Sequence, residues 1–206
     1  MTFFVFVLSN NLFIHLSKNS FFFILCHLCI FFFKKVLENS SKLADYARYT
    51  GCTVIHAPIN FERGHNEIAE LPYGILAGVK EGEAFTNGEW GAEFSPLMTP
   101  KDGDLVVKGK SGLCGFESTN LDFLLRQRGA KNVILGGFLT NCCVESTMRS
   151  AYEKGYKVYT LKDCMAATSQ AGHDATIEHN FGMFSIPTTS DDVKAAIGVR
   201  AAAASG

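Results

Sequence analysis

The first 34 residues of this 206-residue chain contain no aspartate, although they hold more than half of its 18 phenylalanines. Their apolar run, residues 21–33, is interrupted by His27 and closes at Lys34. As a helix it would span about 20 Å, less than the roughly 30 Å of a hydrocarbon core. A basic n-region and a small-residue cleavage site are also missing, which argues against a secretory signal. We interpret residues 1–34 as a short membrane anchor, a degraded first strand or the product of a misread gene start, and favour the last two.

The cysteine pattern lacks any regular framework. Seven cysteines are present, and no Cys-x-x-Cys pair is joined to a second pair, so neither a zinc site nor a disulfide scaffold is indicated. This usage favours a reducing, cytoplasmic compartment. The net charge is −1 with no basic block, which excludes the charge pattern of a nucleic-acid-binding surface. No metal or other cofactor is expected.

From Lys35 onward the chain alternates between two apolar periods, and we expect one hydrolase-sized domain over residues 35–198 with a frayed tail at 199–206. Helices are predicted near 36–49, 119–128, 144–154, 170–180 and 191–197. Strands are predicted at 52–56, 104–108, 132–135, 156–161 and 183–185, and residues 3–8 could form another. Alternation of this kind predicts a three-layer α/β/α fold with an open, mainly parallel sheet. Such sheets place active sites at the carboxyl ends of their strands.

The stretch 136–147, Gly-Gly-Phe-Leu-Thr-Asn-Cys-Cys-Val-Glu-Ser-Thr, stands where a buried strand ends and a helix begins. A thiol at that point is close to unpaired backbone N–H groups and to the positive end of the helix dipole, which stabilise a thiolate. The same N–H groups can hold the oxyanion of a tetrahedral intermediate. Cys142 and Cys143 are therefore candidate nucleophiles, with two ordinary buried cysteines as the alternative.

This stretch, followed by Ala-Tyr-Glu-Lys-Gly-Tyr at 151–156, resembles the nucleophile segment of the isochorismatase-like cysteine hydrolases over residues 35–198. The resemblance implies that Cys143, which directly precedes Val144, is the nucleophile. It also implies that the backbone N–H groups of Leu139 and Cys143 form the oxyanion hole, with a cis peptide bond before Leu139. The family's spacing from a catalytic lysine to Phe116 and Thr119 selects Lys110 and not Lys108.

Substrate-pocket residues are expected at Phe116, Trp90, Thr140 and Asn141. For Trp90, the single tryptophan, a role in anchoring the long connection 58–103 on the core is the favoured interpretation. His56 and His65 are considered as a metal pair, but the Asp-x-His element of the nicotinamidases is absent, and backbone-bonded histidines are the favoured interpretation. Asp163 is expected to serve a structural role through turn hydrogen bonds.

The family also keeps a proton-accepting Asp at the end of its first strand, and this position falls on Leu8 or Ser9 here. We therefore expect a cysteine hydrolase that cleaves a small amide or ureide C–N bond through a Cys143 thioester, impaired by the missing carboxylate. The motif leans towards the biuret and ureidoacrylate branch, and a homo-oligomer is expected. Two alternatives stay open: a silent member that acts in binding or oligomerisation, and a redox protein that uses Cys142–Cys143, disfavoured because adjacent cysteines form a strained disulfide.

Overall fold

The computed structural model describes the backbone of residues 2–7 and 27–204 and the side chains of residues 33–198. Six parallel strands form one sheet in the order β3-β2-β1-β4-β5-β6. The strands are β1 (Thr2–Val7), β2 (Thr53–His56), β3 (Leu105–Val106), β4 (Asn132–Phe138), β5 (Lys157–Ala166) and β6 (Ile186–Thr188). The predicted open α/β fold with a parallel sheet is confirmed.

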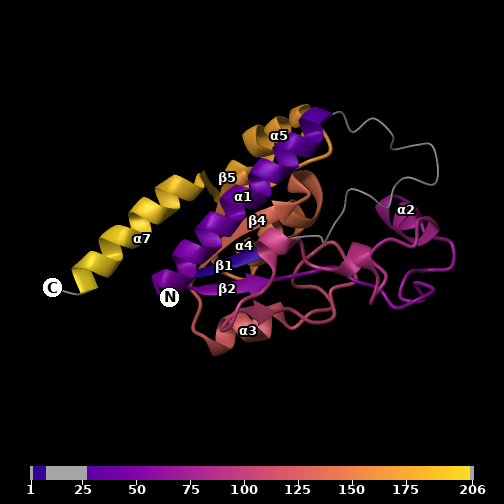
Figure 1. The fold of residues 1–206 in the computed structure, drawn as a ribbon, viewed down its shortest axis with the longest axis horizontal. Coiled ribbons are helices and arrows are strands. Elements are labelled where there is room, and N and C mark those ends of the chain that lie inside the picture. Colours follow the sequence, from indigo (N-terminus) through magenta and orange to yellow (C-terminus); the bar gives the residue numbers. More distant parts are fainter. Residues whose placement is uncertain (1, 8–26, 205–206) are drawn as a thin grey trace.

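Helices cover both faces of this sheet (Figure 1). One face carries α1 (His27–Tyr49) and the start of α7 (Ser190–Ala204), whose apolar side chains pack on Val54, Ile134 and Leu161. The other face carries α3 (Leu121–Gln127) and α4 (Glu145–Glu153), which pack on Val133 and Leu135. Burying both faces of the strands explains why they read as nearly continuous apolar runs.

The first strand lies in the middle of the sheet. β1 pairs with β2 on one side, where Phe3 is aligned with Thr53, and with β4 on the other, where Phe3 is aligned with Val133. The predicted strand at residues 3–8 is thus present, one residue earlier. The positions Leu8 and Ser9, expected to replace the family's aspartate, lie outside the described residues.

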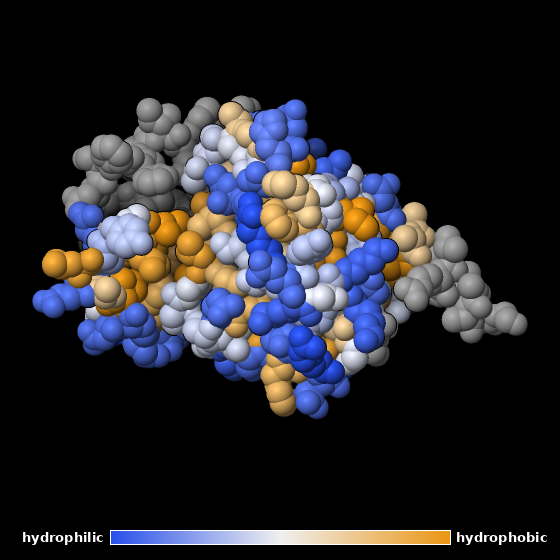
Figure 2. Space-filling model, turned by 180° about the vertical axis from the view of Figure 1, so that it is seen from behind, coloured by the Kyte–Doolittle hydropathy of each residue, from blue (hydrophilic) through white to orange (hydrophobic). Residues whose placement is uncertain are grey.

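The long connection between β2 and β3 carries short elements of its own: α2 (Ile75–Glu81), η2 (Trp90–Ala92) and η3 (Pro96–Met98). Val79 of α2 packs with Ile59, Phe61, Ile68 and Phe85 in a small separate core, whereas Met98 of η3 joins the cluster under α1. Apolar groups also reach the surface at the end of the molecule that carries α2 (Figure 2). Leu71 and Tyr73, just before α2, are 90% and 92% exposed.

Several predicted boundaries are wrong. Helix α1 begins at His27 and not near residue 36, so it reaches into the segment that was set apart from the domain. Strand β5 continues to Ala166, because Gly137 and Phe138 pair with Met165 and Ala166 beyond a register shift, so residues 163–166 are not a loop. Residues 183–185 do not form a strand. They follow α5 (Gln170–Thr176) and the π-helical turn η5 (Ile177–Phe181), which continue into α6 (Gly182–Phe184).

The C-terminal segment is helical to Ala204 and not a frayed tail from residue 199. Its alanine-rich sequence has a high intrinsic helix propensity. The helix start is fixed by Asp163, whose carboxylate accepts hydrogen bonds from the Ser190 N–H at 2.8 Å and from the Ser190 hydroxyl. Asp163 thus has a structural role, as predicted. Its hydrogen bonds stabilise the start of α7 and not the turn in which Asp163 was expected to lie. Within the described part of the chain, no helix has the length and apolar character needed to cross a membrane.

Candidate active site

The turn after β4 carries the candidate nucleophile. A cis peptide bond joins Phe138 to Leu139, as the resemblance implied, and the π-helical turn η4 (Thr140–Val144) leads into α4. The Leu139 carbonyl accepts hydrogen bonds from the N–H groups of Cys142 and Val144, each at 3.1 Å. These bonds close the turn around Cys143, whose side chain is buried at 8% exposure.

The surroundings of Cys143 stabilise its thiolate. A hydrogen bond from the Cys142 thiol has the largest effect, and burial opposes it. The positive charge of Lys110 and the backbone N–H groups of Leu139 and Cys143 add to the stabilisation. Together they lower the pKa of Cys143 from 9.0 to about 6. The neighbouring Cys142 shows the opposite shift: its hydrogen bond to Cys143 and its burial raise its pKa. Of the two adjacent thiols, only Cys143 is set to ionise at neutral pH.

Lys110 is 2% exposed and its ammonium donates a hydrogen bond to the Gly112 carbonyl at 2.7 Å. Burial lowers its pKa, and the nearby thiols of Cys143, Cys114 and Cys142 act in the opposite direction. Lys108 is exposed, so the structure brings Lys110 and not Lys108 to the cysteines. Gly109 makes this possible with a φ of 82°, where a Cβ would lie 2.6 Å from the Ser118 carbonyl oxygen.

The loop that carries Lys110 is tied to the helix of the nucleophile through Thr147. The Thr147 hydroxyl donates to the Cys143 carbonyl at 2.6 Å and accepts from the Gly115 N–H at 2.8 Å. A Cβ on Gly115 would lie 3.1 Å from the Thr147 side chain, so a glycine permits the close approach. The sequence predicts Ser118 or Thr119 as the cap of the next helix, but the cap is Asn120. The Thr119 hydroxyl still accepts a hydrogen bond from the Leu121 N–H at 3.1 Å.

A buried pair that the sequence did not suggest holds the other side of the turn. The Thr140 hydroxyl lies 2.8 Å from Nδ1 of His173, and the two side chains are 0% and 5% exposed. His173 belongs to α5, more than thirty residues along the chain, and a lone histidine in a helix gives no sequence signal. Asn141, the next residue, is exposed.

The other two predicted pocket residues lie in different surroundings. Phe116 is 5% exposed in the same apolar cluster as Cys143, and its ring stacks on Tyr156 with centroids 6.0 Å apart. Trp90 is 45% exposed on η2 and, among the described residues, lies outside the three apolar clusters.

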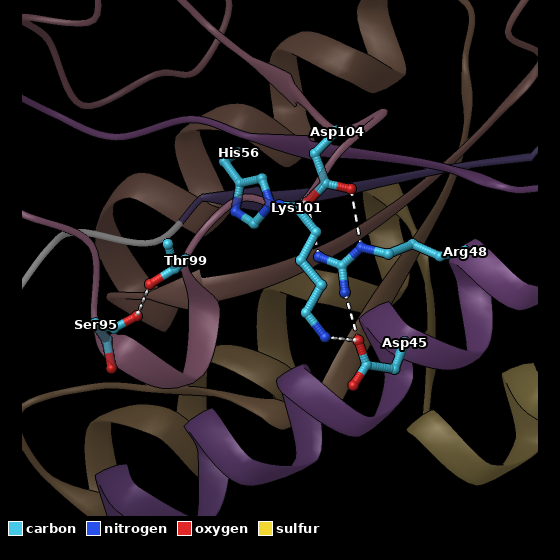
Figure 3. Close-up of polar contacts among 7 residues, drawn as sticks. All are labelled: Asp45, Arg48, His56, Ser95, Thr99, Lys101 and Asp104. Atoms are coloured by element: carbon cyan, nitrogen blue, oxygen red, sulfur yellow. Dashed lines mark hydrogen bonds and ion pairs between the residues drawn. The ribbon is translucent and has the colours of Figure 1, made fainter.

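The two histidines considered as a metal pair have separate partners. His65 is bonded to the Ala84 carbonyl at 2.8 Å and stacks on Phe61, which confirms a backbone partner. His56 is different, because its Nε2 lies 2.8 Å from the Asp104 carboxylate, so a backbone partner was the wrong expectation (Figure 3). Nδ1 of His56 is buried and has no partner among the described residues. In the same part of the chain, no cluster of three His, Cys, Asp or Glu side chains suits a metal ion.

Asp104 also receives the guanidinium of Arg48, with Nε and Nη2 at 2.9 and 2.7 Å. Burial alone would raise the pKa of Asp104, but hydrogen bonds from Arg48, from the Lys101 N–H and from His56 outweigh it and lower this pKa. Asp45 bridges Arg48 and Lys101 on the exposed side (Figure 3). This set joins the end of α1 to the loop before β3. We call Arg48, Asp104, His56, Asp45 and Lys101 the ionic network.

Comparison with known proteins gives a consistent result. The isochorismatase domain model matches residues 21–192. An uncharacterised isochorismatase family protein of Bacillus subtilis is 30% identical over 158 residues, covering 77% of this chain and 81% of its own length. A ureidoacrylate amidohydrolase of Caulobacter vibrioides is 35% identical over 175 residues, covering 76% and 75%.

The fold agrees as well. The structure of an isochorismatase family protein from Burkholderia thailandensis superposes with a TM-score of 0.76 over 96% of this chain and 95% of that one, at 24% identity. The family model spans most of the sheet and both elements that carry Cys143 and Lys110. On these grounds, this chain belongs to the isochorismatase-like hydrolase family.

Proposed function

We propose that this protein is a cysteine amidohydrolase that cleaves the C–N bond of a small amide or ureide. The observation that carries the proposal is the pairing of a Cys143 thiol, whose pKa falls to about 6, with the buried ammonium of Lys110. The amidohydrolase relatives support the reaction class. Thiolates are strong nucleophiles toward carbonyl carbon, and strongly perturbed ionisable groups cluster at functional sites.

In the proposed reaction the Cys143 thiolate attacks the carbonyl carbon of the substrate, and the carbonyl oxygen becomes an oxyanion. The N–H groups of Leu139 and Cys143, which already stabilise the thiolate, would then stabilise that oxyanion. The C–N bond breaks and the nitrogen takes up a proton and leaves as ammonia or an amine. Water then attacks the thioester, releases the acid and restores Cys143.

Proton transfer is the incomplete part of this mechanism. Within the described residues, the groups with the largest effects on the pKa of Cys143 are a thiol, an ammonium and two N–H groups, and none is a carboxylate. General acid–base catalysis is typically worth 10²–10⁴-fold. We therefore propose that the chain as written turns amides over slowly. An aspartate introduced in place of Leu8 or Ser9 would supply the missing carboxylate.

The experiment compares the unmodified chain with Leu8→Asp and Ser9→Asp, using ureidoacrylate and biuret as substrates and ammonia release as the readout. We expect one variant to raise kcat by about 10²–10⁴-fold. Lys110→Met in the same background should remove the gain. If the unmodified chain already works at a rate typical of enzymes, about 1–10³ s⁻¹, another residue supplies the base.

We also propose that the protein forms a homo-oligomer and works in a reducing cytoplasmic compartment. In the substrate pocket we place Thr140 and Asn141 next to the substrate, with Phe116 and Trp90 as further candidates for contact. Exposed apolar side chains such as Leu71 and Tyr73 offer surface for association. Light scattering gives the oligomer number. The competing function is that of a catalytically inactive family member that acts in binding. Inactivity of both aspartate variants on ureidoacrylate and on biuret would favour it.

A further inference from the structure

The turn that presents Cys143 is held by His173, a residue with no place in the mechanism above. His173 lies on α5, and the Lys162 carbonyl on β5 accepts a hydrogen bond from its ring. That carbonyl is in the irregular part of β5, where the pairing with β4 shifts between Leu135 and Gly137. Such irregularities free a backbone group from the ladder, and here it is used to orient a ring.

The surroundings of the His173 ring favour its neutral form. Burial lowers its pKa, and the charge of Asp174 beside it on α5 has a smaller opposing effect. A neutral imidazole carries one N–H, and the Lys162 carbonyl takes it. Nδ1 is then an acceptor for the Thr140 hydroxyl, 2.8 Å away. The tautomer therefore follows from the two partners.

Thr140 lies between the two N–H groups that face the sulfur. It directly follows Leu139, and the N–H groups of Leu139 and Cys143 both stabilise the Cys143 thiolate. The far side of the same turn is fixed by Thr147, whose hydroxyl donates to the Cys143 carbonyl at 2.6 Å. The turn is thus held at both ends by a buried threonine hydroxyl.

We propose that His173 is a positioning residue that fixes Thr140, and through it the Leu139 and Cys143 N–H groups, in the orientation that stabilises negative charge at Cys143. This inference rests on the proposed role of Cys143 as nucleophile. It assigns His173 no contact with the substrate. Loss of the hydrogen bond lets the Leu139–Thr140 peptide rotate, which turns the Leu139 carbonyl away from the Cys142 and Val144 N–H groups that close the turn. The loosened turn no longer holds the Leu139 and Cys143 N–H groups toward the thiolate, while Lys110 keeps its charge.

The test measures the rate of iodoacetamide labelling at Cys143 against pH, resolved by peptide mass. Thr140→Val removes the hydroxyl at nearly constant volume, and Thr140→Ser keeps it. His173→Leu removes the acceptor, and His173→Asn places an amide oxygen near the Nδ1 position. We expect Thr140→Val and His173→Leu to raise the midpoint of the labelling profile by about one pH unit, a rate loss of up to tenfold below the midpoint. Thr140→Ser should stay within about twofold of the unmodified chain, and His173→Asn should restore part of the loss.

Thermal denaturation of each variant separates positioning from stability. A lower melting temperature with an unchanged labelling midpoint in Thr140→Val would show a merely structural pair and overturn the proposal. If His173→Leu does not fold, the comparison of Thr140→Val with Thr140→Ser decides. A shifted midpoint in a protein that hydrolyses no amide would support the positioning role while the substrate class fails. Preferential labelling of Cys142 would instead remove the premise that Cys143 is the nucleophile.

Discussion

Two cations in this molecule, the half-buried Arg48 and the fully buried Lys110, have opposite surroundings. Arg48 lies against Asp104 and Asp45 in the ionic network, so its charge is balanced by carboxylates. Lys110 is more deeply buried, yet within the described residues it forms no ion pair with a carboxylate. The nearby anion is the Cys143 thiolate. A cation paired with carboxylates ties secondary-structure elements together. A buried cation next to an ionisable thiol instead raises the reactivity of that thiol.

The largest expected effect is on chemistry alone. Cys143→Ser should abolish rapid iodoacetamide labelling and lower amide turnover on the order of 10⁴-fold or more, because a serine hydroxyl does not ionise at neutral pH. Its melting temperature should change little. Cys142→Ser is the matched control and should keep most labelling at position 143. If instead labelling persists in Cys143→Ser and disappears in Cys142→Ser, the roles of the two thiols are reversed.

The ionic network should show the reverse pattern, a loss of stability without loss of reactivity. Asp104→Asn leaves His56 without its carboxylate and Arg48 with Asp45 alone, and should cost about 3 kcal/mol in unfolding by urea. Asp102→Asn, an exposed neighbour, is the control and should lie within about 0.5 kcal/mol. The Cys143 labelling rate should be unchanged in both.

The pH dependence of this loss has a definite sign. The pKa of Asp104 is lowered in the folded protein, so its contribution is complete above the ordinary value of 3.8 and is lost as pH falls through the lower folded pKa. The difference between Asp104→Asn and the unmodified chain should therefore shrink in strong acid. A difference that grows with falling pH contradicts this assignment.

Lys110→Met keeps much of the apolar stem and removes the charge. It should raise the pKa of Cys143 by about 1–2 units, since the ammonium is one of the groups that stabilise the thiolate. Labelling at pH 6.5 then falls by roughly 3- to 25-fold, because the unmodified thiol with a pKa of about 6 is already mostly ionised at that pH. Labelling at high pH converges with the unmodified chain. Lys108→Met, on the exposed side of Gly109, should follow the unmodified profile. Equal labelling profiles for Lys110→Met and Lys108→Met would mean that the Lys110 charge does not act on Cys143, and the contrast between Lys110 and Arg48 would fail.

The smallest effect is expected at the exposed rim of the ionic network. Asp45 is 52% exposed and bridges Arg48 and Lys101. Asp45→Asn should cost at most about 1 kcal/mol, the usual range for a surface ion pair. The loss should vanish in high salt, which a urea titration at two ionic strengths can measure. If Asp45→Asn lowers the free energy of unfolding as much as Asp104→Asn does, and independently of salt, then the ionic network cannot be divided into a buried and an exposed half.

Sequence periodicity was enough for the fold class because buried parallel strands and amphipathic helices carry different repeats. It failed where one element passes into another. Residues 183–185 are apolar and short, so strand and helix cannot be distinguished by period, and the helical turns before them decide. β5 was predicted too short because the irregular pairing near Gly137 is a property of two strands and not of either sequence.

At the candidate site, the motif predicted the residues that are local in sequence. The cis bond before Leu139 agrees with what the family resemblance implied, and Lys110, selected by the family's spacing, is buried near the cysteines. The catalytic roles of these residues stay predictions. The His173–Thr140 and His56–Asp104 contacts join residues that only the folded sheet brings together, and a lone histidine has no pattern to reveal its partner.

The central place of β1 has a consequence for how the chain is made. Its partner β2 follows it by some fifty residues and its partner β4 by about 130 residues, so β1 leaves the ribosome before either of them. Until β2 emerges β1 has no ladder, and until β4 emerges one of its edges stays unpaired. Contacts of such sequence separation are slow to form, and unpaired strand edges invite pairing with other chains. We expect newly made protein to depend on chaperones until β4 emerges, and a swap of β1 between two copies to be the main route of misassembly.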